Sequence, residues 1–458
     1  MRSPLAPGKR VLGGPRRPAA RPPLVAALAI AAALCGPGGL PAALEQPEQR
    51  YILFMRTQGV GLQEGRPDTV GPDVFTEVSR HFPEYHPGSE VLVGVGGVFS
   101  YFNHDIELVE ESLRRFLHYA RATRTPVWIK LDGEQWWEAR PDLWNWWRPD
   151  EPGYDPDNAR NVEWSYWGPE YALKIGWRDW GAPLRVLPQP NLMSREYRAA
   201  VHEAMELLVP IIVEWYEALP AAEKSLFAGL NVGWESSIGT SSYYLPNGNS
   251  YLGTPPGDDL DSRLVIKDVL SRGVQQIGYA AVSSAGIRSE GDIEERDLVE
   301  VIGRHLLDLS RKARQLGIPK DKLFTHPFGN ADGEMLYDAA VNSYAHPGWS
   351  EYWNSMDIVK NPGVLRNLHR PQVTQWGSVE WLLLRSVDNA HQWYTAVKRT
   401  LNAPGLKLMC IFNWENTAAK GPNVPRVVNR VIDEGLDPYE LPALAPSERP
   451  DSLYEIKE

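Results

Sequence analysis

Three glutamates lie next to tryptophans where apolar stretches of the sequence end. They are Glu235 in "LFAGLNVGWE", Glu380 in "QVTQWGSVEW" and Glu415 in "LKLMCIFNWE". Glutamate is among the residues least often left fully buried, so its repeated position at the end of a buried stretch needs a reason. Carboxylates that meet in one pocket can serve as a proton donor and as an ionised nucleophile or base. The three glutamates are therefore the candidate catalytic residues.

Two carboxyl groups in different environments are what the hydrolysis of a glycosidic bond requires. One must stay protonated to donate to the leaving oxygen, and burial or a neighbouring like charge raises its pKa. The other must stay ionised, either to attack the anomeric carbon or to activate a water. Tryptophan rings add a flat apolar surface for the C–H face of a sugar. Any one of these strand endings would equally fit a helix N-cap or a salt-bridged carboxylate, and it is their number that favours carbohydrate chemistry.

A long tryptophan-rich segment extends this interpretation. Ten of the 18 tryptophans lie between residues 128 and 180, among prolines, glycines, aspartates and asparagines that are typical of loops. Such a loop on the active face would form a wall of a carbohydrate cleft; the alternative is that its indoles pack the loop itself. Asp132 and Glu134 directly follow the apolar run "PVWIKL", and Trp136 and Trp137 come next. We expect all four to contact a sugar.

The elements that position these residues alternate between short apolar runs and amphipathic stretches. Helices are predicted over 105–122, 194–218, 292–316 and 385–401, with N-caps at Asp105 and Ser194. The alternation favours an α/β fold, a (β/α)₈ TIM barrel with long Trp-rich loops on its C-terminal face, over a doubly wound open sheet. The open sheet would carry a glycine-rich phosphate loop after an early strand. In a barrel the carboxyl ends of all strands meet at one face, so the glutamates would share a pocket. Seven runs are predicted strands: 51–56, 91–99, 126–133, 226–235, 322–329, 372–381 and 406–415.

Residues 1–44 differ from the rest of the chain. Six basic residues and no acidic one precede or flank the apolar run "LVAALAIAAALC" and a small-residue stretch, which predicts a secretory signal peptide or, alternatively, an uncleaved N-terminal anchor. We assign 45–436 to the barrel and 437–458 to a C-terminal tail. Without residues 1–44 the formal charge changes from −11 to −17 and one cysteine, Cys410, remains. Export without a disulfide indicates the bacterial periplasm or the medium, and the acidic body argues against nucleic-acid and membrane partners.

Other chemistries fit the sequence less well. It has no G-x-S-x-G elbow, no H-E-x-x-H motif, no P-loop and no dinucleotide fingerprint. The acidic run at 150–158 has oxygen ligands suitable for calcium, but its spacing matches no calcium loop and favours a solvated turn. His104, Asp105 and His326 could be metal ligands from different strands, although a single histidine at a strand end is more often a hydrogen-bonding partner. We expect no metal and no cofactor.

At these residues the chain resembles the broad superfamily of (β/α)₈ glycoside hydrolases, which carry an acid/base glutamate after the fourth strand and a nucleophile after the seventh. The resemblance implies that Glu235 is the acid/base and Glu380 the nucleophile, with Glu415 in reserve. It also implies that Trp414 lies under the sugar after the eighth strand. His326 would lie near the sixth strand, where an aromatic residue or histidine orients the nucleophile.

The sequence departs from the superfamily pattern at two places. An asparagine usually precedes the acid/base directly, whereas here Trp234 has that place and Asn231 lies four residues before Glu235. The stretch "VTQWG" is similar to the usual seventh-strand motif, with Gln375 in the nucleophile's place and Trp376 after it. We expect these four residues to contact substrate.

The sequence therefore predicts a secreted or periplasmic glycoside hydrolase that cleaves a neutral oligo- or polysaccharide. The alternative is a carbohydrate-binding protein of the same fold that has lost one carboxylate. Carbohydrate is the one partner that we expect.

Overall fold

The computed structural model describes residues 45, 49–56, 64–174, 176–179, 183–238, 240–241, 275–328, 334–352, 355–383, 389–417 and 423–444. The predicted signal peptide at 1–44 and the last part of the predicted tail lie outside the described residues. Those that are described belong to one compact unit, which begins at Pro41. In this part of the chain no helix is both long and apolar enough to cross a membrane.

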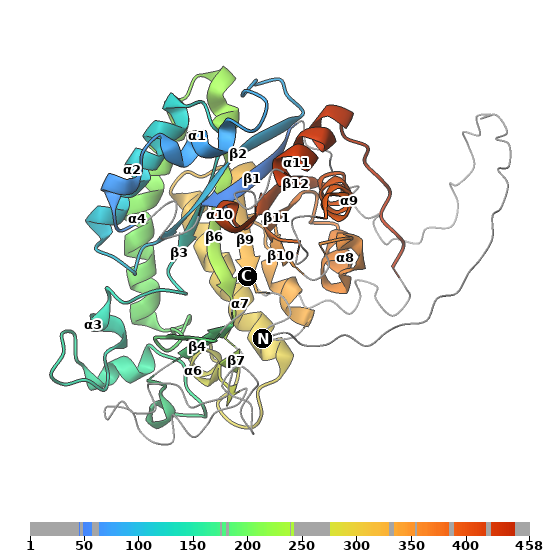
Figure 1. Ribbon diagram of the computed structural model, residues 1–458. Coiled ribbons are helices and arrows are strands. Elements are labelled where there is room, and N and C mark those ends of the chain that lie inside the picture. The colour runs from blue at the N-terminus through green and yellow to red at the C-terminus, as the bar shows by residue number, and fades with distance from the viewer. Residues whose placement is uncertain are drawn as a thin grey trace, which may run out of the picture. The chain divides into compact units, whose positions relative to one another are not determined.

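Eight parallel strands form the centre of this unit (Figure 1). Their spatial order is β10-β11-β12-β1-β2-β3-β6-β9, so each strand pairs with the next one along the chain and the last pairs with the first. Their bounds are Arg50–Arg56 (β1), Val91–Ser100 (β2), Val127–Asp132 (β3), Phe227–Ser236 (β6), Leu323–Pro327 (β9), Gly348–Glu351 (β10), Trp376–Trp381 (β11) and Leu406–Ile411 (β12).

The two edge strands, β9 and β10, also meet. Phe324 forms a parallel bridge with His346, just before β10. The Thr325 amide donates to the His346 carbonyl at 3.2 Å, and the His346 amide donates to the Leu323 carbonyl at 2.8 Å. The sheet therefore closes on itself, which confirms the predicted (β/α)₈ barrel.

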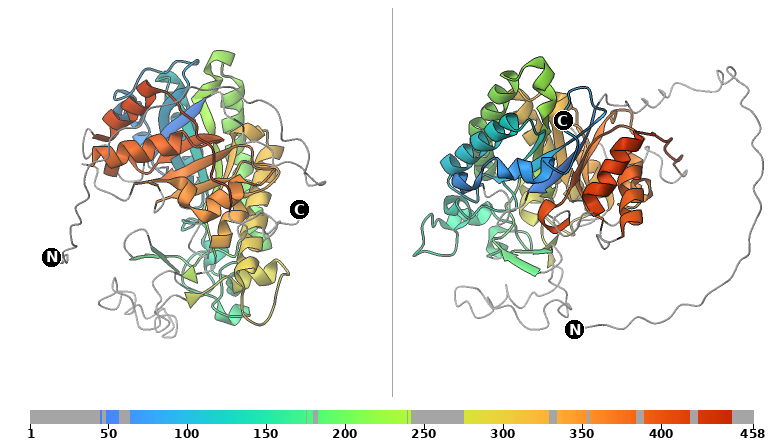
Figure 2. Two further views of the ribbon diagram at one scale, coloured as in Figure 1. Left: turned by 90° about the vertical axis from the view of Figure 1, so that its right-hand side faces the viewer. Right: turned by 45° about the horizontal axis from the view of Figure 1, so that its top comes forward.

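Helices cover the outside of this barrel (Figure 2). The larger ones follow barrel strands: α1 Asp73–Ser79, α2 Ile106–Ala122, α4 Arg195–Glu217, α7 Glu295–Gln315, α8 Pro362–Leu368, α9 Ala390–Leu401 and α11 Asn423–Glu434. Shorter elements lie in the connections: α3 Pro141–Trp144, α6 Tyr279–Ser284, α10 Trp414–Thr417, and the paired strands β4 Gly176–Asp179 with β5 Pro183–Val186 and β7 Thr240–Ser241 with β8 Gln275–Gln276. The 3₁₀ helices are Pro67–Thr69, Pro156–Arg160, Pro169–Tyr171, Ala221–Leu226, Lys320–Lys322, Glu334–Ala340 and Ile358–Lys360.

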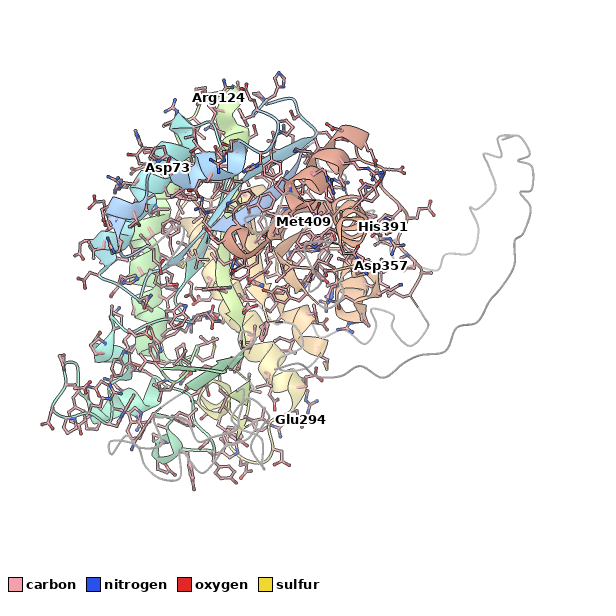
Figure 3. The ribbon with its side chains drawn as sticks, viewed as in Figure 1. Asp73, Arg124, Glu294, Asp357, His391 and Met409 are labelled. Carbon is pink, nitrogen blue, oxygen red and sulfur yellow. The ribbon has the colours of Figure 1, made fainter. Side chains whose placement is uncertain are left out.

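The helix ends follow from local sequence. The Ser194 hydroxyl accepts the Tyr197 amide at the start of α4, as an N-cap does. Helix α7 begins at a capping box formed by Glu294 and Asp297, and Figure 3 shows Glu294 at that end of the helix. It ends before Gly317, whose φ of +109° only glycine adopts readily. These caps lie within a few residues of the predicted ends.

The barrel buries both faces of its strands. In β1, Tyr51, Leu53 and Met55 join a cluster inside the barrel, while Ile52 and Phe54 pack outward under the helices. Alternate residues of a strand face opposite sides, which explains the continuous apolar runs. We call the inside group the inner cluster; its members are Tyr51, Leu53, Met55, Leu92, Val98, Trp128, Ala228, Trp234, Phe324, Val379, Leu408 and Cys410.

His346, at the closure of the barrel, gives stability a pH dependence. Burial, with the charges of Lys320 and Lys407, lowers the pKa of His346 from 6.5 to about 4. Between these two pKa values His346 binds a proton in the unfolded chain but not in the native chain. The free energy of unfolding therefore decreases as the pH falls from the pKa of the unfolded state towards that of the native state. We expect the wild type to lose about 1–2 kcal/mol more than His346→Asn between about pH 7 and about pH 5 in urea unfolding. The exposed His118→Asn is the control, and equal losses in wild type and His346→Asn would contradict the prediction.

Candidate active site

Glu235, His326 and Glu380 meet at the carboxyl ends of three barrel strands. They belong to β6, β9 and β11, the fourth, fifth and seventh strands of the barrel. One carboxylate oxygen of each glutamate and one ring nitrogen of His326 lie within 4.8 Å of one another. All three side chains are buried. The structure thus brings together two of the three predicted glutamates and the predicted histidine.

The Glu380 carboxylate accepts hydrogen bonds from three sides. Lys130 Nζ donates to Oε2 at 2.8 Å, and Trp234 Nε1 donates to the same oxygen at 3.0 Å. The Tyr352 hydroxyl donates to Oε1. Lys130 and Glu380 form an ion pair with 0% and 3% of their side chains exposed. Both oxygens of Glu380 thus accept hydrogen bonds, and one of them contacts a buried cation.

His326 lies between Lys130 and the backbone of Glu235, with its Nδ1 3.9 Å from Glu380 Oε2. Its Nδ1 lies 3.4 Å from Lys130 Nζ and 3.4 Å from the backbone amide of Glu235, and both of these groups are donors. Its Nε2 lies 2.6 Å from the Ser350 hydroxyl. Burial, with the charge of Lys130, holds the pKa of His326 well below 6.5. His326 is therefore neutral, with its proton on Nε2 and its Nδ1 as an acceptor.

Glu235 has an uncommon backbone conformation. Its φ is +49°, in the left-handed region that residues other than glycine seldom occupy. The Gln135 side-chain amide donates to the Trp234 carbonyl at 2.5 Å and reaches the Glu235 carbonyl at 3.5 Å. The Ser236 hydroxyl donates to Glu134 Oε1 at 2.9 Å. Contacts on both sides thus hold the strained residue, a pattern typical of functional positions.

Asp132 and Glu134 support this backbone from behind. Asp132 Oδ1 accepts the amides of Glu134 at 2.8 Å and Gln135 at 3.0 Å, which fixes the turn after β3. Burial raises the pKa of Asp132 to about 6. Glu134 Oε1 lies 3.0 Å from His305 Nε2 of α7. Both oxygens of Asp132 and Oε1 of Glu134 are engaged inside the protein, which supports a positioning role, and contact of the two residues with sugar stays a prediction.

Three more predicted substrate contacts, Trp137, Asn231 and Trp414, are buried. Trp137 is 1% exposed and donates to the Pro188 carbonyl in the core. The Asn231 amide is buried and donates to the Gly233 carbonyl two residues ahead on its own strand. Trp414 packs edge-on against Phe54 with ring centroids 5.1 Å apart. Trp137 and Trp414 therefore pack inside the protein, where no sugar contact is expected. Asn231 is in register with Lys130 on the inner face of the barrel, and its Oδ1 has no partner among the described residues, so its contact with sugar stays a prediction.

Gln375 and Trp376 lie at the wrong end of their strand. Strand β11 begins at Trp376, so both residues are at its amino end, while Glu380 is near its carboxyl end. The Gln375 amide donates to Glu45 at 3.3 Å, and the fully buried Trp376 donates to the Pro404 carbonyl. The similarity of "VTQWG" to a seventh-strand motif was therefore misleading.

Glu415 is not part of the close cluster that Glu235, His326 and Glu380 form among the described residues. It follows β12 in α10, and its Oε1 accepts a hydrogen bond from Arg56 Nε at 2.6 Å. Its predicted function as the reserve catalytic residue is not supported by this placement, since a salt-bridged carboxylate was the other interpretation of such an ending. Trp234 lies against Glu380, and the partly buried Trp136 packs on the inner cluster beside it.

The sixth barrel strand carries a residue that the sequence analysis missed. His326 was expected near that strand but lies in β9, the fifth, because the four-residue β10 was not predicted. Tyr352, directly after β10, is the residue that contacts Glu380 there. Lys130 was also missed. Its signal was a lone lysine two residues from Trp128 in a buried strand, a spacing that places both on the inner face.

The long connection between β3 and α4 contains nine of the 18 tryptophans. Trp137, Trp144 and Trp164 are buried in the main core, and Trp146 and Trp147 are partly buried against it. The indoles of Trp144 and Trp146 donate to backbone carbonyls of the same connection. For these residues the alternative interpretation, packing of the loop itself, is the one observed.

Glu235, His326 and Glu380 could also ligate a metal ion by distance alone. The ammonium of Lys130 already contacts Glu380 and faces His326 Nδ1. A cation bound at these atoms would have to displace that ammonium or lie against it. The Lys130 ammonium thus already supplies the positive charge beside Glu380 that a metal ion would bring.

No family model matches the sequence, and no curated protein matches it. Several solved structures are similar in fold. A glycoside hydrolase family 5 enzyme from Prevotella bryantii is 10% identical, with 85% of this chain and 99% of that chain covered and a TM-score of 0.39. A xyloglucan-specific β-1,4-glucanase of that family, from a ruminal metagenomic library, is 8% identical, with 87% and 97% covered and a TM-score of 0.40.

A third structure, a family 5 protein from Bifidobacterium longum in complex with Manβ1-4GlcNAc, is 9% identical, with 85% of this chain and 80% of that chain covered and a TM-score of 0.40. These proteins belong to the class of barrel that the sequence resembles. At such identities no residue's role is transferred to this chain, and the barrel itself rests on the strand order and closure described above.

Proposed function

We propose that the protein hydrolyses glycosidic bonds, with Glu235 as the acid/base and Glu380 as the nucleophile. One observation carries the proposal: two buried carboxylates at the ends of the fourth and seventh barrel strands have oxygens within 4.8 Å of each other. Carboxyl groups about 5–5.5 Å apart serve retaining glycosidases, whereas inverting enzymes need about 6.5–9.5 Å to admit a water. We include retention of configuration in the proposal, because the nearer oxygens of the two groups approach within 4.8 Å.

The proposed mechanism gives the two carboxyl groups different tasks. Glu380, positioned by hydrogen bonds from Lys130, Trp234 and Tyr352, attacks the anomeric carbon and forms a glycosyl ester. Glu235 donates its proton to the leaving oxygen as that bond breaks. In the second step Glu235 takes a proton from water, which attacks the anomeric carbon and releases Glu380. The neutral His326 accepts a hydrogen bond from the Glu235 amide at Nδ1, and this contact helps to fix the backbone of Glu235 in both steps.

The proposed substrate is a neutral oligo- or polysaccharide. Trp234 borders Glu380, and the partly buried Trp136 lies on the same inner cluster, so these two indoles are the proposed sugar contacts. Export to the periplasm or the medium is part of the proposal and rests on the leader-like residues 1–44.

A carbohydrate-binding protein of the same fold is the second candidate. The observation that favours it is the close pairing of Glu380 with Lys130, since an ammonium 2.8 Å from a carboxylate oxygen lowers the nucleophilicity of that oxygen. A protein that only binds sugar would use the same indoles and need no free carboxylate.

Glu235→Gln separates the two candidates. In an enzyme, loss of the general acid is expected to lower turnover of aryl glycosides by about 10²–10⁴-fold while sugar binding, measured by calorimetry, persists. The exposed Glu440→Gln is the control. Absence of turnover by the wild type across a panel of aryl glycosides, with sugar binding equal in wild type and Glu235→Gln, would establish the binding protein instead.

A further inference from the structure

A cavity of about 450 Å³ lies outside the barrel, where α4, α6 and α7 come together. Three arginines line it: Arg198 of α4 and Arg304 and Arg311 of α7. Asp308 and Ser284 also line it, and apolar side chains complete the wall. None of these residues lies on a barrel strand, so the cavity is separate from the Glu235 cluster.

The positive charges in this cavity outnumber the negative ones. Asp308, the one acidic lining residue, accepts hydrogen bonds from Arg198 Nε at 3.1 Å and is 3.0 Å from His202 Nε2. Although burial acts in the opposite direction, these hydrogen bonds and charges lower the pKa of Asp308 to about 2. Asp308 therefore stays ionised and paired with Arg198 and His202. Arg304 is paired with the buried Glu300, so Arg311 is the lining arginine that has no carboxylate partner among the described residues.

These two arginines retain donors that the described residues do not use. Arg304 donates through Nε to Glu300 at 2.6 Å and through Nη1 to the Ala285 carbonyl at 2.9 Å, and its Nη2 has no acceptor among the described residues. The Arg311 guanidinium stacks over the Tyr344 ring, 5.4 Å from its centroid. In the described part of the chain its N–H groups meet no acceptor. Ser284 Oγ accepts the Asn191 amide at 2.9 Å, so its own proton can be donated.

We propose that this cavity binds the oxyanion group of a small ligand, a phosphate or a carboxylate, between Arg304 and Arg311. Guanidinium groups present paired N–H donors that match the oxygens of either anion. Stacking on Tyr344 restricts the Arg311 guanidinium before any ligand binds. The volume lies within the range of about 300–1,000 Å³ that small-molecule sites occupy. A cluster of arginines also stands out on a chain whose formal charge is −11. The proposal is independent of glycoside hydrolysis.

Titration calorimetry of the full chain with inorganic phosphate and, separately, with glucuronate tests the proposal. At an ionic strength of about 0.01 M, where the Debye length is about 30 Å, we expect saturable binding of at least one anion to one site. Phosphate alone would identify a phosphate ligand, glucuronate alone a carboxylate ligand, and both the shared chemistry. Arg311→Gln is expected to weaken the binding about tenfold, because charge-assisted hydrogen bonds are lost.

Two further variants separate a specific site from a general effect of positive charge. Arg296→Gln, on the exposed first turn of the same helix, should bind as the wild type does. Arg311→Lys keeps the charge but not the paired donors, and it should bind with intermediate affinity. Thermal unfolding checks that each variant is folded. No saturable heat with either anion, or equal affinity in wild type and Arg311→Gln, would overturn the proposal.

Discussion

Glu380→Ala is expected to lower the turnover of an aryl glycoside by on the order of 10⁵-fold, the scale seen when an enzyme loses its nucleophile. The glycosyl ester can no longer form, and no other described carboxylate replaces it: Glu415 is paired with Arg56, and Asp132 caps a turn. The variant leaves Lys130 Nζ and Trp234 Nε1 facing the space where the carboxylate was. These donors should hold a small anion there.

Adding azide to Glu380→Ala provides a second test of the role of Glu380. It should restore turnover to Glu380→Ala and yield a glycosyl azide of inverted configuration, since it attacks from the face that Glu380 used. Glu351→Gln is the matched control on the neighbouring strand. Burial raises the pKa of Glu351 to about 8, so its carboxyl group is already neutral at neutral pH and glutamine should preserve activity. Turnover of Glu380→Ala within tenfold of the wild type would remove Glu380 from the mechanism.

Lys130→Met is expected to reduce the free energy of unfolding by about 3–5 kcal/mol, because it leaves the buried Glu380 carboxylate without its cation. Both side chains of the pair are almost fully buried, and Lys130 also lies 5.4 Å from the centre of the Trp234 ring. The double variant Lys130→Met with Glu380→Gln should recover a large part of the loss, since no charge then remains unpaired. Urea unfolding of the wild type and the three variants gives the coupling energy directly.

An exposed ion pair provides the comparison. Arg114 and Glu110 lie 3.8 Å apart on the surface of α2, with 57% of the arginine side chain exposed. Arg114→Met should cost less than about 1 kcal/mol. If Lys130→Met unfolds within about 1 kcal/mol of the wild type, the charge balance inferred for the site is wrong.

Several features of the protein were determined by local sequence. Seven of the eight barrel strands and the helices α2, α4, α7 and α9 follow from hydrophobic spacing and from caps such as Ser194, both of which involve neighbouring residues only. Because parallel strands of a barrel present their carboxyl ends at one face, the position of Glu235 and Glu380 near strand ends was enough to predict that they lie together. Trp234 and His326 were placed near them for the same reason.

The tertiary structure decided which side chains face the pocket. Strict alternation would put Val379 and Glu380 of β11 on opposite sides of the sheet, yet Val379 belongs to the inner cluster and Glu380 contacts Lys130 inside the barrel. The pairing of β11 with β12 is irregular between Ser378 and Trp381, and such an irregularity re-aims side chains. Strand register is fixed by partners far away in sequence, so no local pattern reveals it.

The same reason explains the corrected residues. Gln375 and Trp376 lie at the amino end of β11 because pairing with β10 and β12 fixes where that strand begins. Glu415 pairs with Arg56, a residue more than 350 positions earlier that only barrel closure brings near. Residue types and strand order were legible in the sequence. The ion pairs, the burial of the indoles and the choice between Glu380 and Glu415 required the packed barrel, because each depends on contacts between distant segments.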